Sequence, residues 1–468
     1  MTEAKSLNRY WLAVVAGYVL VTAVLVARVA AAGGTHAELS PLYAVLQPRF
    51  SPWGLFALPF FALLLALLPR LRGARARVFL PAATLWGAAL ALAVTMLWTG
   101  VAELPARAIP VFLHDLTKLG DPSAFIGSYH ELIKSLSDHG HVRPPGLFYF
   151  FWGVVKVVGR DRYALQTVIT LLSAAAAFPV YGLARRFLGR EASAMAALLY
   201  LLSGNFILHG ISYDGLFGTL GAAGIFLFVV VAQKGRWRDT VAAGALCTIA
   251  AFSSFTLAFL LVLGGCLLIY YGVKDRRFGS LLLRAVVILA MPAAFLVVLH
   301  ATTGYDFLAN FEESYRWAQT QASGGMNVFK LLTGWELPAD YPRPSFYRSY
   351  WLWGPGNLFA MFFMLGIPTA ALYFWWARGL LRRAAWAEPL NAVFGTALVA
   401  FLIFNFTGVT LGETERVWLY LLPLFTVPAA ARLADAEEAT GSRRFAPLVL
   451  VVLFAQVVTM RLCFWIPW

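Results

Sequence analysis

Apolar runs of about 20 residues recur from one end of the chain to the other, and they limit the possible folds more than any other feature. A run of this length lets an α-helix cross roughly 30 Å of hydrocarbon. Lipid offers the backbone no hydrogen-bonding partner, so a spanning segment is a helix or part of a closed barrel, and runs this continuous are helical. With 60% hydrophobic and 13% charged residues, the chain is not an ordinary soluble globular protein. The sequence predicts an all-α, polytopic transmembrane helix bundle.

About thirteen spans are predicted. They lie at 10–31, 54–69, 78–99, 163–187, 192–212, 215–232, 240–253, 255–272, 281–300, 352–377, 390–408, 416–432 and 446–464. We expect a single integral membrane domain, 1–468. Its parts are N-terminal spans (1–99), an exoplasmic active-site loop with juxtamembrane helices (100–162), further spans (163–300), a second exoplasmic loop (301–351) and C-terminal spans (352–468).

The distribution of charge predicts which side of the membrane each connection occupies. The chain carries a net charge of +14, and the basic residues gather in short connections at 70–77, 185–190, 233–238, 274–279 and 378–383. Cytoplasmic connections are rich in Lys and Arg. We therefore expect a multi-pass protein of the cytoplasmic (inner) membrane with a cytoplasmic N-terminus, an exoplasmic active site and all seven histidines outside. The basic charge reports topology and attraction to anionic lipid, so no nucleic-acid partner is expected.

Polar residues are densest at 111–146, which holds four of the seven histidines. Asp121-Pro122 is a favourable helix start, and apolar residues at helical spacing predict an amphipathic helix over 122–137, closed by Gly140. A shorter helix is expected at 110–118. The apolar segment 147–158 is too short to span and is expected to lie in the membrane interface.

Several residues of this loop have two interpretations. Asp115 lies among apolar neighbours, where an acid is costly unless it is paired or used, so it is a candidate catalytic base. Asp121 is a helix cap or a second candidate base. Glu131 is a partner of Lys134 on a solvated face or part of the substrate site, and Glu312-Glu313 is expected to lie on a solvated helical face. His139 and His141 are interfacial polar residues or phosphate ligands.

Four segments carry a resemblance to a known superfamily, and one of them is RSYWLWGPGNLFAMFFMLGIP at 348–368. The loop ends in LSDHGHVRPPG, with His139, His141 and Arg143 before two prolines; YDGLFGTLGAAG follows at 213–224, and GETERVWLYLLP at 412–423. This pattern resembles the GT-C membrane glycosyltransferases, and within them a bacterial group that uses polyprenyl-phosphate sugars. That group more often has histidine where this chain has Arg143, which leaves a permanent cation at that position.

The resemblance implies a GT-C-like fold and an enzyme that moves a sugar from a polyprenyl-phosphate donor to a hydroxyl of a glycan, lipid or protein acceptor, with inversion. Such a reaction needs a base for the hydroxyl and donors around the leaving phosphate. The candidates are Asp115 and Asp121 for catalysis, Arg143, His139, His141 and Arg416 for the phosphate, and Asp214, Glu413, Glu415 and Glu131 for the substrate site. For Asp214 the other interpretation is helix capping, and for Arg416 it is contact with lipid headgroups. No metal site is predicted and no cofactor is expected to be required, although a divalent metal is compatible with the reaction.

Two other functions remain open from the sequence. A transporter or flippase of a lipid-linked or amphipathic solute would place charges near the bilayer midplane, often in paired halves, whereas the charges here gather at span ends. Another lipid-dependent exoplasmic transferase is the other alternative. A phosphotransferase would need a soluble catalytic domain and an acyltransferase would need a suitable membrane-embedded histidine, and the sequence shows neither. The sequence favours the glycosyltransferase.

Overall fold

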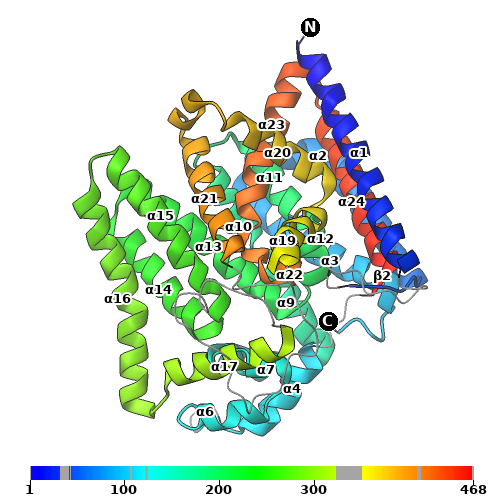
Figure 1. Ribbon diagram of the computed structural model, residues 1–468. Coiled ribbons are helices and arrows are strands. Elements are labelled where there is room, and N and C mark those ends of the chain that lie inside the picture. Colours follow the sequence, from blue (N-terminus) through cyan, green and yellow to red (C-terminus); the bar gives the residue numbers. More distant parts are fainter. Residues whose placement is uncertain are drawn as a thin grey trace.

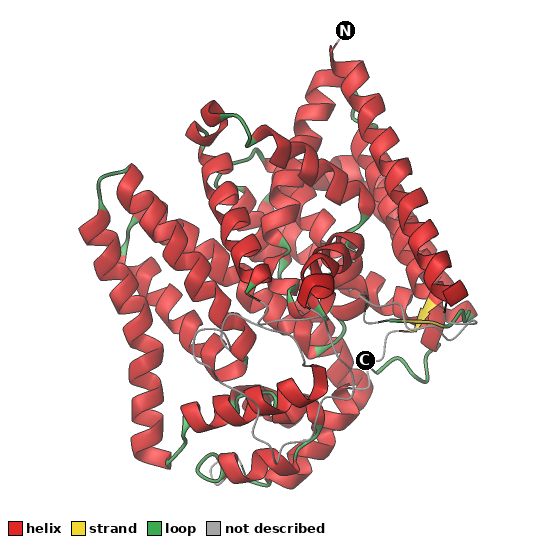
Figure 2. Ribbon diagram, viewed as in Figure 1, coloured by secondary structure: helices red, strands yellow, loops and turns green. Residues whose placement is uncertain are grey.

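The computed structural model describes residues 2–31, 42, 44–105, 108–121, 125–322, 350–407 and 413–465. In these ranges the chain is almost entirely helical, with two strands of two residues each, so the predicted all-α bundle is confirmed (Figures 1 and 2). His36 of the first connection lies outside the described residues.

Ten helical segments of the described chain are long and apolar enough to cross a membrane. They are Tyr10–Ala27 within α1 (Thr2–Ala31), Pro52–Gly73 (η1, Pro52–Phe56, and α2, Ala57–Gly73), α3 (Ala76–Thr99), Arg162–Ala184 (α9, Arg162–Ala174, and α10, Ala177–Ala184), α13 (Tyr213–Lys234), Phe255–Lys274 (η3, Phe255–Ala258, and α15, Phe259–Lys274), α16 (Phe278–Thr303), α21 (Pro389–Phe406), Leu419–Thr440 (η5, Leu419–Leu421, and α23, Pro423–Thr440) and α24 (Phe445–Cys463).

Two further predicted spans have a different form. The segment 192–212 divides at Ser203 into α11 (Arg190–Leu202) and the short α12 (Gly204–His209), because the Ser203 hydroxyl caps α12 by accepting from the Phe206 amide at 3.2 Å. The segment 240–253 belongs to α14 (Trp237–Ser253), which has 17 residues. The predicted number of thirteen is therefore approximate.

The predicted span 352–377 is bent by 116° between α19 (Tyr350–Leu365) and α20 (Ile367–Gly379). Gly366 forms the break with φ +99°, a conformation that L side chains rarely adopt, and a Cβ there would lie 2.1 Å from Leu453. Gln456 of α24 satisfies the backbone at the break: its Oε1 accepts from the Ile367 amide at 2.9 Å and its Nε2 donates to the Phe363 carbonyl at 2.8 Å. The bend is therefore held by hydrogen bonds from a neighbouring helix.

The glycine-rich run of α13 allows close packing against its neighbours. A Cβ on Gly221 would lie 2.1 Å from the Cβ of Tyr420, and one on Gly218 would lie 2.9 Å from the Tyr200 hydroxyl. Only glycine lets η5 approach α13 this closely. This approach brings the segment that follows residue 412 to the beginning of α13.

Short helices gather at the end of the bundle opposite the N-terminus of α1 (Figure 1). They are α4 (Ala108–Leu119), α6 (Tyr129–Leu132), η2 (Ile133–Ser135), α7 (Asp138–His141), α8 (Gly146–Val158) and α17 (Phe307–Ala322). The 13-residue α8 contains the apolar segment 147–158, and its location in the membrane interface stays a prediction. We refer to this region as the loop end of the bundle.

The prediction of one continuous helix over 122–137, closed by Gly140, is wrong in its described part. From residue 129 the chain forms α6, η2 and then a separate α7 that contains Gly140. The break occurs because Leu136 is extended, with ψ 167°, and Ser137 begins the new helix as its cap. Residues 122–124 lie outside the described part.

Two long-range contacts were not foreseen. Strands β1 (Val45–Leu46) and β2 (Phe464–Trp465) pair antiparallel and join the first connection to the end of α24. At the other end of the bundle, buried Arg72 of α2 forms an ion pair with buried Glu437 of α23, with 3.1 Å between Nη1 and Oε1.

Candidate functional site

Asp214 connects three distant parts of the chain at the start of α13. The Ser212 hydroxyl caps this helix by accepting from the Asp214 amide at 3.2 Å. The Asp214 carboxylate is 3% exposed; its Oδ1 lies 3.4 Å from Nη2 of Arg143 and its Oδ2 lies 2.8 Å from Nη1 of Arg416. We name Asp214, Arg143, Arg416, Glu413, Tyr213 and His139 the Asp214 cluster.

Arg143 is buried and fixed through both its backbone and its side chain. Its guanidinium lies 5.1 Å from the ring centres of Tyr213 and of Phe217, and its Nη1 donates to the Ser254 hydroxyl at 3.3 Å. The Tyr129 hydroxyl donates to the Arg143 carbonyl at 2.8 Å. The guanidinium is therefore stabilised by the aromatic faces over which it lies, and it points at the carboxylate of Asp214.

Arg416 enters the cluster from α22 (Thr414–Val417). Besides the contact with Asp214, it forms an ion pair with Glu413, and its Nη1 donates to the Tyr213 hydroxyl at 3.3 Å. Burial opposes the charge, but the carboxylates of Asp214 and Glu413 outweigh it and raise the pKa of Arg416 well above its ordinary value. Arg416 is therefore a permanent cation, and Thr414 anchors its helix by donating to the Asn357 carbonyl at 3.1 Å.

Glu413 has a left-handed backbone, with φ +57°, which is costly for a residue other than glycine. Its side chain is 24% exposed, whereas that of Asp214 is 3% exposed. Of the two carboxylates that compensate Arg416, Glu413 is thus the more accessible. Strained backbone of this kind is often found at functional sites.

His139 of α7 contacts the cluster through its ring, with 3.2 Å between Nδ1 and the Tyr213 hydroxyl. Burial, reinforced by the charges of Arg416 and Arg143, lowers the pKa of His139 to about 4. The histidine is neutral at pH 7, so two arginines face two carboxylates and the charges of the Asp214 cluster balance.

His141, two residues later, contacts α17. Its Nε2 lies 3.2 Å from Oε1 of Glu313, its ring stacks on Trp317 at 4.4 Å with 5° between the planes, and its carbonyl accepts from the Ser314 hydroxyl at 2.9 Å. Burial lowers the pKa of His141, and Glu313 opposes this shift. The expectation that Glu313 lies on a solvated face is wrong, since it is 7% exposed, while Glu312 pairs with Arg316 on the surface.

Asp115 is 0% exposed, and Ser137 contacts both oxygens of its carboxylate. The Ser137 amide donates to Oδ1 at 3.0 Å and its hydroxyl donates to Oδ2 at 2.5 Å, while Nζ of Lys118 lies 3.9 Å from Oδ1. The same Ser137 oxygen accepts from the Gly140 amide at 3.2 Å and so caps α7. A Cβ on Gly140 would lie 2.7 Å from Asp115 Oδ2. Asp115 therefore holds the N-terminus of the helix that carries His139.

None of the remaining candidates is buried among the described side chains. Asp121 follows Gly120 at the end of α4 and is exposed, and Glu131 is exposed on α6. Glu415 belongs to α22, but its side chain lies outside the described part of the chain. Within the described ranges, no group of three or more His, Cys, Asp or Glu side chains has an arrangement that could hold a metal ion.

The sequence did not point to Tyr213, Ser137 or Ser254 as contributors to the site. Tyr213 immediately precedes Asp214, so its position could have drawn attention to it. Ser137 stands before an acid and two histidines, which is a capping pattern. Ser254 separates α14 from η3 and falls between the predicted spans 240–253 and 255–272.

The family model for dolichyl-phosphate-mannose-protein mannosyltransferase matches residues 142–300. This segment contains Arg143, Asp214 and Ser254, and the match confirms the resemblance to membrane glycosyltransferases in this part of the chain. No curated protein matches the chain.

Two solved structures are similar to this chain at low identity. The crystal structure of ArnT from Cupriavidus metallidurans bound to undecaprenyl phosphate has a TM-score of 0.45 and 17% identity, covering 70% of this chain and 58% of that one. The oligosaccharyltransferase of Archaeoglobus fulgidus in the apo form has a TM-score of 0.46 and 13% identity, covering 81% of this chain and 56% of that one. This chain thus spans less than two thirds of the length of either.

Proposed function

We propose that this protein transfers a sugar from a polyprenyl-phosphate donor to an acceptor hydroxyl at the exoplasmic face, with inversion at the anomeric carbon. The observation that carries the proposal is the convergence of two buried arginines, Arg143 and Arg416, on Asp214 at the loop end of an apolar bundle. A donor with a long lipid tail presents its phosphate at such a boundary between apolar helices and a polar surface. The description of the matched family names a lipid-phosphate-linked sugar.

The two arginines suit a leaving phosphate. Negative charge develops on the phosphate as the bond to the sugar breaks, and fixed guanidinium donors stabilise that charge. In the structure Asp214 and Glu413 already balance the arginines. Because Glu413 is the more exposed of the two, we propose that the phosphate displaces Glu413 from Arg416 while Asp214 keeps both guanidinium groups in place.

The two histidines predicted to contact phosphate have different surroundings. His139 touches Tyr213 within the Asp214 cluster and is neutral at pH 7, so we assign it a hydrogen bond to the phosphate rather than a charge. The contacts of His141 with Glu313 and Trp317 support a role in docking α17, and its role as a phosphate ligand stays a prediction.

The carboxylates of Asp115 and Asp121 were both predicted to take the proton of the acceptor hydroxyl. They differ in how easily an acceptor can reach them. A base must come within hydrogen-bonding distance of the hydroxyl. Asp121 is exposed, so an acceptor can reach it directly, whereas an acceptor can reach Asp115 only in a state in which Ser137 has turned away. We therefore propose Asp121 as the base and assign to Asp115 the positioning of α7. Asp115 as the base stays a prediction for the rearranged state.

Transport is the second candidate because a broken helix is typical of transporter sites. The bend between α19 and α20 has this form. At the described break, however, Gln456 bonds the Ile367 amide and the Phe363 carbonyl, so these two groups are not open to a solute. Glycosyl transfer remains the better supported function.

The test is incubation of the purified protein with a panel of radiolabelled polyprenyl-phosphate sugars, followed by measurement of label in water-soluble or acceptor-linked products. We expect labelled sugar to be released from at least one donor, and we expect this release to be lost in Arg416→Gln. As a matched control, Arg238→Gln changes an arginine whose side chain is 75% exposed and should keep the activity. Uptake of label into liposomes without any transfer would favour transport instead.

A further inference from the structure

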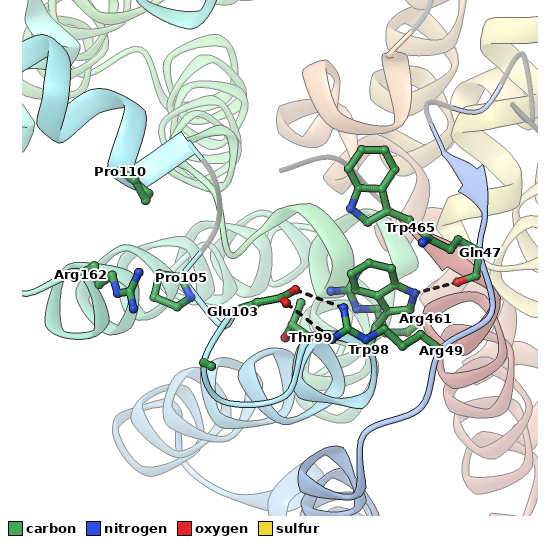
Figure 3. A pocket seen from close by; sticks show the side chains of 11 residues that line it. Gln47, Arg49, Trp98, Thr99, Glu103, Pro105, Pro110, Arg162, Arg461 and Trp465 are labelled. Carbon is green, nitrogen blue, oxygen red and sulfur yellow. Dashed lines mark hydrogen bonds and ion pairs between the residues drawn. The ribbon is translucent and has the colours of Figure 1, made fainter. Parts of the chain in front are cut away.

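A polar cavity lies near the ends of α3 and α24 and the starts of α4 and α9 (Figure 3). It encloses about 510 Å³, which is within the range of small-molecule sites. Its lining consists of Gln47, Arg49, Trp98, Thr99, Ala102, Glu103, Pro105, Pro110, Arg162, Arg461 and Trp465. Of the Asp214 cluster and the predicted site residues, none is part of this lining.

Arg461 is the informative residue of this cavity. It is 4% exposed and forms no ion pair with any described residue. Its Nε donates to the Thr95 carbonyl at 3.3 Å, and its guanidinium lies 5.7 Å from the ring centre of Trp98. The C-terminus of α24 favours a cation nearby, but a helix end supplies only about half a charge. A buried guanidinium without a carboxylate is costly unless an anion accompanies it.

The cavity as a whole is positive and aromatic. Three arginines and one glutamate line it, and the glutamate, Glu103, is paired with Arg49 at 3.3 Å. Arg461 and Arg162 are left to face the cavity. Figure 3 shows Trp98 and Trp465 on one side of it, with Trp98 fixed by its bond to the Gln47 carbonyl at 2.8 Å. Arginines select an anion, and flat indole faces with nearby polar groups suit a sugar ring.

The cavity is connected to the proposed catalytic region through two elements. Pro110, in the lining, and Asp115 lie on the same helix, α4. His209 of α12 is fully buried and lies within electrostatic reach of both Arg461 and Arg416. The cavity therefore shares α4 with Asp115 and has no residue in common with the Asp214 cluster.

We propose that this cavity binds the acceptor through an anionic group, and that the acceptor is an acidic or phosphorylated saccharide. Arg461 pairs with the anion, Arg162 contributes at the rim, and Trp98 and Trp465 contact the sugar. The assignment as acceptor rests on the proposed function, whereas binding of an anionic saccharide can be tested without any transfer reaction.

The experiment measures binding of glucose 6-phosphate, glucuronate, glucose and inorganic phosphate to the purified full-length protein in phosphatidylcholine nanodiscs by calorimetry. Glucose 6-phosphate or glucuronate should bind at least about tenfold more tightly than glucose and inorganic phosphate. Arg461→Gln should weaken this binding by about tenfold or more, the scale of a charge-assisted contact. Arg162→Gln, at the exposed rim, should weaken it severalfold even if Arg461→Gln fails to fold.

Different results would overturn different parts of the proposal. Equal binding by the wild type and both arginine variants refutes the cavity as an anion site. Tighter binding of inorganic phosphate than of either anionic saccharide, unaffected by Trp465→Ala, refutes the saccharide. If phosphatidylglycerol in the nanodisc displaces glucose 6-phosphate, the cavity binds a lipid headgroup, and this result also refutes the saccharide.

A second variant separates this proposal from the proposed function. Arg416→Gln should weaken polyprenyl-phosphate binding and leave glucose 6-phosphate binding unchanged. Arg461→Gln should weaken glucose 6-phosphate binding and leave polyprenyl-phosphate binding unchanged. If only the Arg461 effect is absent, the cavity assignment fails and the donor site stands. If only the Arg416 effect is absent, the donor site fails and the anion cavity stands, without its assignment as the acceptor site.

Discussion

Replacing Asp115 by asparagine tests whether this buried carboxylate acts on α7 or on the acceptor. The substitution keeps the size of the side chain but turns one acceptor oxygen into an NH₂ group and removes the charge. In the structure Oδ1 accepts from the Ser137 amide and Oδ2 from the Ser137 hydroxyl. Asparagine can accept only one of these two bonds, and that bond is no longer charge-assisted.

The expected magnitude follows from these two bonds. A hydrogen bond to a charged group contributes about 1.5–3 kcal/mol, which is about a 10- to 150-fold change in an equilibrium constant. Lys118 adds little, because its ammonium lies 3.9 Å away and is 35% exposed. Since α7 carries His139 to Tyr213, we expect Asp115→Asn to weaken binding of the polyprenyl-phosphate donor by roughly this factor.

The assay combines donor binding with single-turnover transfer in Asp115→Asn, Ser137→Ala and the double variant. If Asp115 positions α7, both single variants weaken donor binding and the double variant loses much less than the sum. A fall in turnover of about 10²–10⁴ with donor binding intact, and with Ser137→Ala nearly normal, would show that Asp115 is the base and refute the positioning role.

Three further predictions concern charge and stability. Asp214→Asn removes the one ion pair that Arg143 forms within the described chain, so we expect about 3–5 kcal/mol of destabilisation in thermal or denaturant unfolding. Because the native pKa of His139, about 4, lies below the ordinary value of 6.5, its contribution to stability should be fully present above pH 6.5 and be lost as the pH falls towards 4; His139→Gln should flatten that part of the stability profile. Arg72→Met leaves Glu437 buried and unpaired, and unfolding measurements should show a loss of about 3–5 kcal/mol, whereas an unchanged midpoint would show that water reaches the pair.

The fold was largely predictable because hydropathy alone identifies helices in lipid. What the hydropathy pattern could not reveal is where a helix breaks. Gly366 lies within a continuous apolar run, and its bend depends on Gln456, a residue 90 positions later in the chain. The division at Ser203 likewise depends on a local cap that hydropathy does not register.

The candidate site was predictable as a set of residue types but not as a geometry. Arg143, Asp214 and Arg416 were chosen separately, and only the packing of η5 and α13 shows that they meet. The sequence also gave no sign that Ser137 covers Asp115, because a contact between residues 22 positions apart on separate helices has no periodic signature. The cavity around Arg461 depends on the pairing of β1 with β2. Strands of two residues are too short to be recognised from a sequence pattern.

The proposed function requires that Arg143 and Arg416 together hold the phosphate of a lipid-linked donor. Its most direct test is equilibrium binding of a short-chain polyprenyl phosphate to the purified protein at pH 7 and at fixed ionic strength. We expect Arg143→Gln and Arg416→Gln each to weaken binding by about tenfold or more, and Arg238→Gln to bind as the wild type does. Wild-type affinity in both cluster variants, once each is shown to be folded, would contradict the assignment of these arginines to the donor phosphate.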